Sequence, residues 1–126
     1  MSVESSTALH EPFIPLRVLV EYDQKYKFSV AHCLQTGNVV TADDADTAEE
    51  MIKELLGDEV TYAISHNNLK NLFSSPAPMD VWKRWSVTAA QNGTKTFKLD
   101  IIARELKLDE PDVSEVKVAR AAAAAA

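Results

Sequence analysis

The sequence predicts an α+β fold, with an antiparallel sheet in the order β-β-β-α-β, one long amphipathic helix on one face, a short helix and a second hairpin. Three strand-like runs come first, at 16–22, 27–34 and 38–42. An apolar stripe at helical spacing follows from residue 47. An Asn-Gly pair at 92–93, which favours a tight turn, then lies between two further strand-like runs. Together these features indicate one domain of mixed secondary structure.

The three runs are expected to form a meander. Because side chains alternate between the faces of a strand, the first run has two distinct faces. One face carries Val18, Val20 and Tyr22, and the other carries Arg17, Leu19 and Glu21. The short polar connection 23–26 predicts an antiparallel hairpin with the second run, and turn residues at 36–38 lead into β-branched residues at 39–42. We therefore expect a half-buried first strand followed by two antiparallel strands.

The helix after this meander begins with a capping pattern. Thr47 and Glu50 stand three residues apart, as in a capping box. Apolar residues then recur at spacings of three and four: Met51, Ile52, Leu55, Leu56, Val60, Ala63 and Ile64. We expect this stripe to lie across the sheet and the helix to continue through Gly57, although glycine there costs about 0.5–1 kcal/mol relative to alanine. Aspartate in place of Met51 or Leu55 should then unfold the domain by burying a charge.

A short helix is predicted in the second half of the chain. Pro76 and Pro78 break the preceding segment. Asp80 is positioned to cap a helix that contains Trp82 and Trp85, although the two tryptophans could equally begin a strand. The large side chains of these two tryptophans are expected to be buried.

The predicted domain organisation has three parts. A flexible arm at 1–15 contains prolines and serines without an apolar period. A single domain at 16–108 follows, and within it the runs 86–90 and 94–102 are expected to pair as the second hairpin. The remainder, 109–126, is predicted to be a frayed tail, because its terminal alanines have high helix propensity but nothing to bury them.

Composition and charge are those of an ordinary globular protein. Apolar residues make up 46% and charged residues 25% of the 126 residues, so neither disorder nor a membrane span is expected. The formal net charge of −6 disfavours direct binding of nucleic acid or anionic lipid. The first residues do not show the pattern of a signal peptide, and the single cysteine, Cys33, cannot form an internal disulfide. We therefore expect a cytoplasmic protein.

No combination of residues forms a self-sufficient catalytic or metal-binding signature. His32 and Cys33 are neighbours, but neighbours on a strand point to opposite faces and cannot share a proton. His32, His66 and the acidic link at 43–46 lack the short ligand spacings typical of metal sites. We therefore predict no catalytic residue, no metal ligand and no cofactor.

The order of elements from residue 16 to about 60 carries a resemblance. The chain begins this stretch with a strand, a tight connection and a second strand that ends in a small residue. A link that contains a glycine, a third strand and an acidic entry to a helix then follow. The residues concerned are Val18, Val20 and Glu21, then Phe28, Val30 and Ala31, then Gly37, then Asp46, Thr47, Glu49 and Glu50. This order resembles the HicB-like antitoxin fold, including its stand-alone members, with departures at 23–26 and at 76–85.

The resemblance implies a fold and a function. It implies a β-β-β-α-β sheet with a helix on one face, and a non-catalytic protein that binds and masks a small basic HicA-type toxin ribonuclease. Many members add a DNA-reading module after this core. The segment after Ala103 is too short for one, so autorepression and direct nucleic-acid binding are not expected.

Six residues are the predicted partner-binding positions: Glu21, Tyr22, Asp43, Asp44, Trp82 and Trp85. The acidic residues would complement a basic partner. The tryptophans flank Lys83 and Arg84 and admit two interpretations. They are either buried in the core, which is usual for an isolated tryptophan pair, or exposed as a stacking platform.

Two other functional classes stay open. Exposed edge strands would pair between copies, which would make the protein a homo-oligomeric structural or assembly subunit. Lys95 and Lys98, on the expected second hairpin, would oppose such pairing at that edge. A small enzyme that uses Asp43, Asp44 and Asp46 is the least favoured class, because two carboxylates would have to converge in a pocket with at least one displaced pKa.

Overall fold

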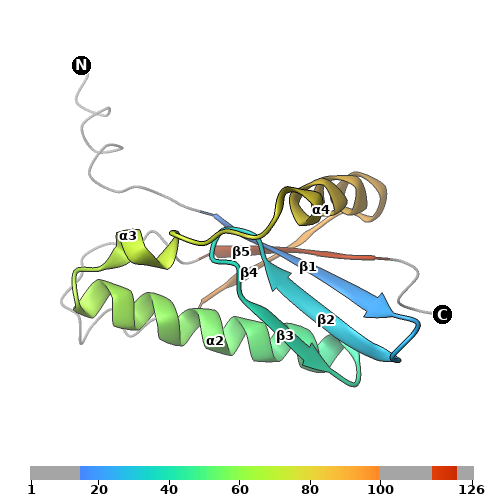
Figure 1. Ribbon diagram of the computed structural model, residues 1–126, viewed down its shortest axis with the longest axis horizontal. Coiled ribbons are helices and arrows are strands. Elements are labelled where there is room, and N and C mark those ends of the chain that lie inside the picture. The colour runs from blue at the N-terminus through green and yellow to red at the C-terminus, as the bar shows by residue number, and fades with distance from the viewer. Residues whose placement is uncertain (1–14, 100–114, 122–126) are drawn as a thin grey trace, which may run out of the picture.

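A computed structural model of the protein describes residues 15–99 and 115–121, which form a five-stranded sheet with helices on both faces (Figure 1). The strands are β1 (Leu16–Asp23), β2 (Phe28–Cys33), β3 (Val39–Ala42), β4 (Lys95–Lys98) and β5 (Glu115–Arg120). The helices are α2 (Ala45–Ser65), α3 (Leu69–Leu72) and α4 (Met79–Asn92). The predicted α+β class is confirmed. In the described part of the chain, no helix combines the length and apolar character that a membrane crossing requires.

The sheet has the strand order β3-β2-β1-β5-β4, with β1 at its centre. Its first three strands form the predicted antiparallel meander, in which Val20 of β1 pairs with Ala31 of β2. Asp23 closes the β1–β2 turn, because its Oδ1 accepts hydrogen bonds from the backbone N–H groups of Lys25 and Tyr26 at 2.9 and 3.0 Å. The predicted hairpin at 23–26 is therefore confirmed.

The last strand of the sheet is the main difference from prediction. β5 runs parallel to β1, so the sheet is mixed and not antiparallel throughout. The frayed tail predicted at 109–126 is wrong for Glu115–Arg120, which lies between β1 and β4 with Val116 and Ala119 fully buried. This pairing joins residues about a hundred positions apart in the sequence, so local sequence patterns do not predict it. All of the predicted arm at 1–15 except Pro15 lies outside the described residues, as do residues 109–114 and 122–126 of the predicted tail.

α2 begins three residues before the predicted position. Asp44 is its N-cap, and the Asp44 Oδ1 accepts a hydrogen bond from the backbone N–H of Thr47 at 2.7 Å. Thr47 is thus the third helical residue, and the predicted capping box of Thr47 and Glu50 is wrong. An aspartate supplies the same kind of acceptor one turn earlier. The helix continues through Gly57, as predicted.

One face of α2 packs across the sheet and builds the main core. Its buried residues are Ala48, Ile52, Leu56, Val60 and Ala63, which lie against Leu16, Val18, Val20, Ala31, Cys33, Val116 and Val118. The predicted stripe is confirmed at most positions. Met51, however, is 42% exposed and Leu55 is only half-buried, because the covered face of the helix is narrower than the apolar pattern. The structure therefore removes the reason to expect unfolding from aspartate at Met51.

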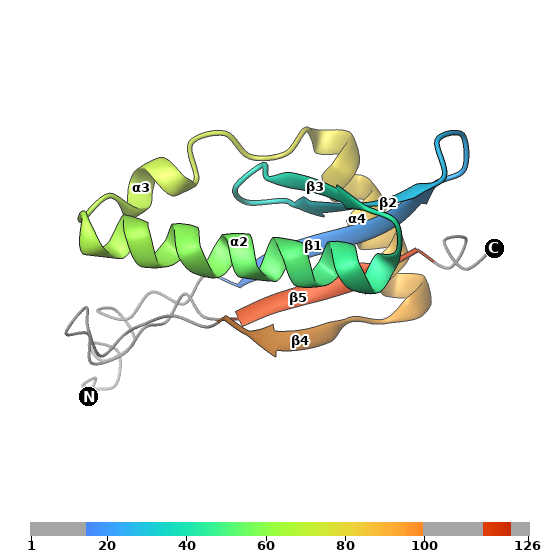
Figure 2. The ribbon, with the colours of Figure 1, turned by 90° about the horizontal axis from the view of Figure 1, so that it is seen from below.

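α4 covers the opposite face of the sheet, as Figures 1 and 2 show. Leu19 and Leu34 are fully buried there and pack with Val81 of α4. Trp82 and Trp85 close the sides of this second, smaller core. The predicted single covered face is therefore wrong, since the sheet lies between two helical layers.

The predicted second hairpin is replaced by the end of α4. Residues 86–92 are helical, and Gly93, with φ of 80°, ends the helix by donating its N–H to the Ala89 carbonyl at 2.8 Å. The Asn-Gly pair thus serves a helix end, which needs the same left-handed backbone as a hairpin turn. The helix also begins at Met79, before the predicted cap Asp80. β4 pairs with β5, and its predicted continuation to residue 102 lies outside the described residues from 100 onward.

Candidate functional site

The structure distributes the six predicted partner-binding residues over three places. Glu21 and Tyr22 lie near the end of β1, Asp43 and Asp44 lie between β3 and α2, and Trp82 and Trp85 lie on α4. Glu21 contacts α4 through Arg84, but each place has its own polar contacts. Each therefore has to be assessed by its own contacts.

Glu21 is held in a charged cluster under α4. Its Oε1 lies 3.2 Å from His32 Nε2, and its Oε2 accepts a hydrogen bond from Arg84 Nε at 2.7 Å. Arg84 also bonds to Asp80 at 2.8 Å. The hydrogen bond from His32, with that from Arg84, lowers the pKa of Glu21 from 4.5 to about 2, although burial alone would raise it. A carboxylate that stays ionised and is already bonded on both oxygens is unsuited to proton transfer near neutral pH.

A pocket of about 550 Å³ opens beside this cluster. Tyr22 and Val30 line it together with Glu21, His32 and Arg84. Glu21 neutralises the arginine that would otherwise attract an anionic ligand. The cluster therefore joins α4 to the sheet.

The two tryptophans act mainly as core residues. Trp82 Nε1 donates to the Ala77 carbonyl and Trp85 Nε1 to the Val18 carbonyl, each at 3.1 Å. Both indoles are half-buried, and the Arg17 guanidinium lies 5.4 Å from the centre of the Trp85 ring. Because their polar atoms are bonded to the backbone and their rings pack on the sheet, the geometry favours burial over an exposed stacking platform.

The acidic exit, which comprises Asp43, Asp44 and Asp46, links β3 to α2. Asp44 is fully exposed and its pKa is lowered by the hydrogen bond that it accepts from Thr47. Asp46 forms an ion pair with Arg120 at 2.7 Å. Asp43 is exposed. Asp44 and Asp46 bind separate partners, so these two carboxylates do not converge as a catalytic pair would require.

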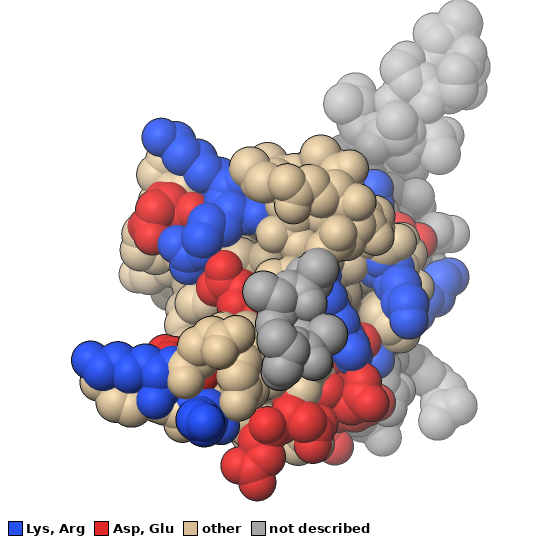
Figure 3. Space-filling view, turned by 90° about the vertical axis from the view of Figure 1, so that its right-hand side faces the viewer, with Lys and Arg blue, Asp and Glu red and all other residues tan. Residues whose placement is uncertain are grey.

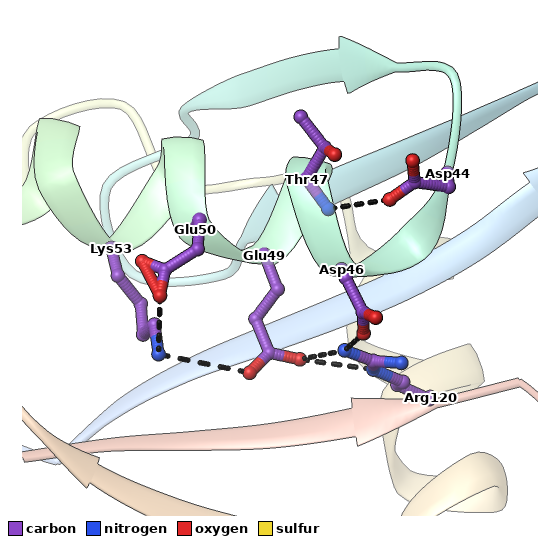
Figure 4. Close-up of polar contacts among 7 residues, drawn as sticks. All are labelled: Asp44, Asp46, Thr47, Glu49, Glu50, Lys53 and Arg120. Atoms are coloured by element: carbon purple, nitrogen blue, oxygen red, sulfur yellow. Dashed lines mark hydrogen bonds and ion pairs between the residues drawn. The ribbon is translucent and has the colours of Figure 1, made fainter.

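An ion-pair network continues from the acidic exit along α2 (Figure 4). Glu49 is only 6% exposed, and its Oε1 accepts hydrogen bonds from Arg120 Nε and Nη2 at 2.9 and 2.8 Å. Lys53 lies 3.8 Å from carboxylate oxygens of both Glu49 and Glu50, and 3.8 Å from the centre of the Phe97 ring. The network links α2 to β5 through Arg120 and to β4 through Phe97. Sequence reasoning missed it because Arg120 falls in the segment that was predicted to be a tail.

His32 and Cys33 lie on opposite faces of β2, as predicted. Cys33 is fully buried in the main core, and this burial raises its pKa. His32 faces Glu21 on the other side of the sheet. Among residues 15–99 and 115–121, no three His, Cys, Asp or Glu side chains converge in a way that would hold a metal ion.

The end of the molecule that carries the acidic exit is shown in Figure 3. Acidic side chains gather at its lower edge, the side on which α2 lies in Figure 1, while lysines and arginines are spread around the remainder. The acids with the most exposed side chains at the start of α2 include Asp46 at 88% and Glu50 at 75%. This edge is the strongest candidate surface for a basic partner.

Comparison of the chain with protein-family models, with curated proteins and with solved structures finds no match. Functional conclusions therefore rest on the geometry of the chain itself and on the order of its elements.

Proposed function

We propose that this protein is a non-catalytic binding module that masks a small basic protein, as a HicB-like antitoxin masks a HicA-type toxin ribonuclease. The observation that carries the proposal is the topology around β1. Three antiparallel strands lead through an acidic exit into a long helix, and after α3, α4 and β4 the last strand, β5, pairs parallel to β1. This supports the β-β-β-α-β layout on which the resemblance depends.

The proposed docking surface is the acidic exit together with the outer edge of β3. Asp43 and Asp44 are exposed directly after β3, and Val39 of β3 is 56% exposed. Among the described strands, β3 pairs only with β2, so its other edge can accept a strand from a partner. Basic side chains that flank such a strand would meet the acidic exit, which favours both association rate and orientation.

A cytoplasmic location without direct nucleic-acid binding is part of this proposal. Cys33 is a free thiol buried in the core, which suits a reducing compartment. The net charge of −6 opposes contact with phosphate backbones.

Self-assembly is the second candidate function, and the two sheet edges favour it unequally. β4 carries Lys95 and Lys98, which discourage strand pairing along that edge. β3 carries no lysine and exposes Val39, so it is the edge through which two copies would pair. Light scattering over a wide concentration range tests this function. A dimer that Val39→Lys converts to a monomer supports it, and a monomer at every concentration contradicts it.

The partner-binding proposal is tested by co-expression with a small basic ribonuclease-like protein encoded beside the gene. We expect the two proteins to co-purify and the toxicity of the partner to be suppressed. Asp43→Asn with Asp44→Asn should weaken the complex, because it removes two charges while asparagine still caps α2.

The matched control removes two charges elsewhere on α2, by Glu54→Gln with Asp58→Asn. Both control residues are exposed, so the variant should fold and bind as the wild type does. Absence of any complex, or equal weakening by both double variants, would contradict the proposed docking surface.

A further inference from the structure

A cavity of about 700 Å³ lies between the C-terminal half of α2, α3 and the turn that precedes β3. Figure 2 shows these segments side by side along one flank of α2. The side chains that bear on its chemistry are Asn38, Asp58, Glu59, Tyr62, Asn68 and Asn71. Its size is within the range of about 300–1,000 Å³ that holds small molecules.

The walls of the cavity are built by contacts between distant segments. Gly37, with φ of 81°, brings the turn against the Ser75 backbone, where a Cβ atom would collide with the Ser75 carbonyl oxygen. Ala77 donates its N–H to the Leu34 carbonyl at 2.9 Å and holds the same segment to the end of β2. The cavity is therefore a formed part of the fold.

The electrostatics of the cavity favour a positive charge. Asp58 and Glu59 both line it, and its lining contains no lysine or arginine. None of the ion pairs within the described residues involves either carboxylate. The last turn of α2 also contains no basic residue. No side chain of that turn therefore offsets the negative end of the helix dipole.

Other lining groups favour hydroxyl groups and a compact organic framework. Asn38 Nδ2 donates to Glu59 Oε2 at 3.1 Å, which orients that carboxylate and leaves it able to accept further donors. Asn68 and Asn71 add amide groups that can both donate and accept. Tyr62 is 61% exposed, and its ring stacks on His66 with centres 3.9 Å apart, which presents an aromatic group of the kind that attracts organic cations.

We propose that this cavity binds a small amine that also carries hydroxyl groups, such as an amino sugar or an amino alcohol. The ammonium group binds at the acidic wall of the cavity, which Asp58 and Glu59 line, and the hydroxyl groups bond to the asparagine amides. The site uses none of the residues that are changed in the docking tests, Asp43, Asp44 and Val39. Failure of one proposal therefore leaves the other standing.

The test is a titration of the isotope-labelled full chain at physiological ionic strength, followed by the movement of its amide resonances. The probes are D-glucosamine and 2-aminoethanol, with D-glucose and ethylene glycol as their uncharged counterparts. We expect saturable movement of the Tyr62, Asn68 and Asn71 amides with the amines, and affinity lower by about tenfold or more for the uncharged compounds.

Variants separate this site from general attraction to an acidic protein. Asp58→Asn should weaken amine binding by about tenfold or more, while Glu54→Gln, one turn earlier on α2, removes the same charge and should leave binding unchanged. Tyr62→Leu supplies a second variant at an exposed position if Asp58→Asn perturbs the fold. Saturation by neither amine, equal affinity for the uncharged compounds, or equal effects of Asp58→Asn and Glu54→Gln would each overturn the proposal.

Discussion

Replacing Glu21 with Gln tests the charged cluster that joins α4 to the sheet. The folded protein lowers the Glu21 pKa from 4.5 to about 2, through the hydrogen bonds from His32 and Arg84. At about 1.4 kcal/mol per pKa unit, this difference of about 2.5 units corresponds to at most about 3.5 kcal/mol of stability. The side chains of Glu21 and Arg84 are 25% and 43% exposed, so solvent screening reduces the expected loss to about 1–2 kcal/mol.

The loss of stability caused by Glu21→Gln should depend on pH. Because the folded pKa is lower than the unfolded one, Glu21 stabilises the fold above about pH 4.5, and the contribution disappears as the pH falls towards 2. Urea unfolding of wild type and Glu21→Gln, followed by circular dichroism, should show the full difference at pH 7 and a shrinking one below pH 4.5. Glu54→Gln, which alters an exposed carboxylate, is the control. A difference between wild type and Glu21→Gln that stays constant from neutral to acidic pH would refute the reasoning.

Three further predictions concern the fold. Asp44→Ala should lower the free energy of unfolding more than Thr47→Ala does, because Asp44 holds the N-cap hydrogen bond of α2, and equal effects would refute the assigned cap. Leu56→Asp should abolish cooperative thermal unfolding because it buries a charge, whereas Met51→Asp should fold, and an unfolded Met51→Asp would contradict the burial of α2. A chain that ends at residue 114 should lack the near-ultraviolet dichroism of a packed core, because β5 is removed from between β1 and β4; a native spectrum would contradict the strand order.

The sequence predicted the local elements well and the distant pairings poorly. The meander is predicted by the alternation of apolar and polar residues, and the continuity of α2 by apolar residues at helical spacing. Both patterns are visible among neighbouring residues of the sequence. β5 depends on β1 and β4 as partners, and its alternation of Val116, Lys117 and Val118 is too short to stand out before a run of alanines. Gly93 shows a different limit, because a left-handed glycine after asparagine serves a helix end as well as a hairpin turn.

The candidate sites divide in the same way. The sequence located the start of α2 to within one turn, but it assigned the cap to Thr47 where the structure has Asp44. It did not reveal that Arg84 and Glu21 meet, since their contact joins positions 63 apart across two layers of the fold. The cavity beside Tyr62 was also missed, because its walls come from three segments and its residue types are ordinary for turns and helix ends.

The two helical layers limit where a protein partner can bind. α2 and α4 cover opposite faces of the sheet, so within the described part of the chain the two sheet edges and the outer helix surfaces are left for contact. The edge at β4 carries Lys95 and Lys98, which would repel a basic partner as well as oppose strand pairing. The edge at β3 instead ends in the acidic exit, where opposite charge and an unpaired strand edge coincide. A basic partner should therefore be sensitive to Val39→Lys, which changes the β3 edge, and indifferent to Lys95→Gln.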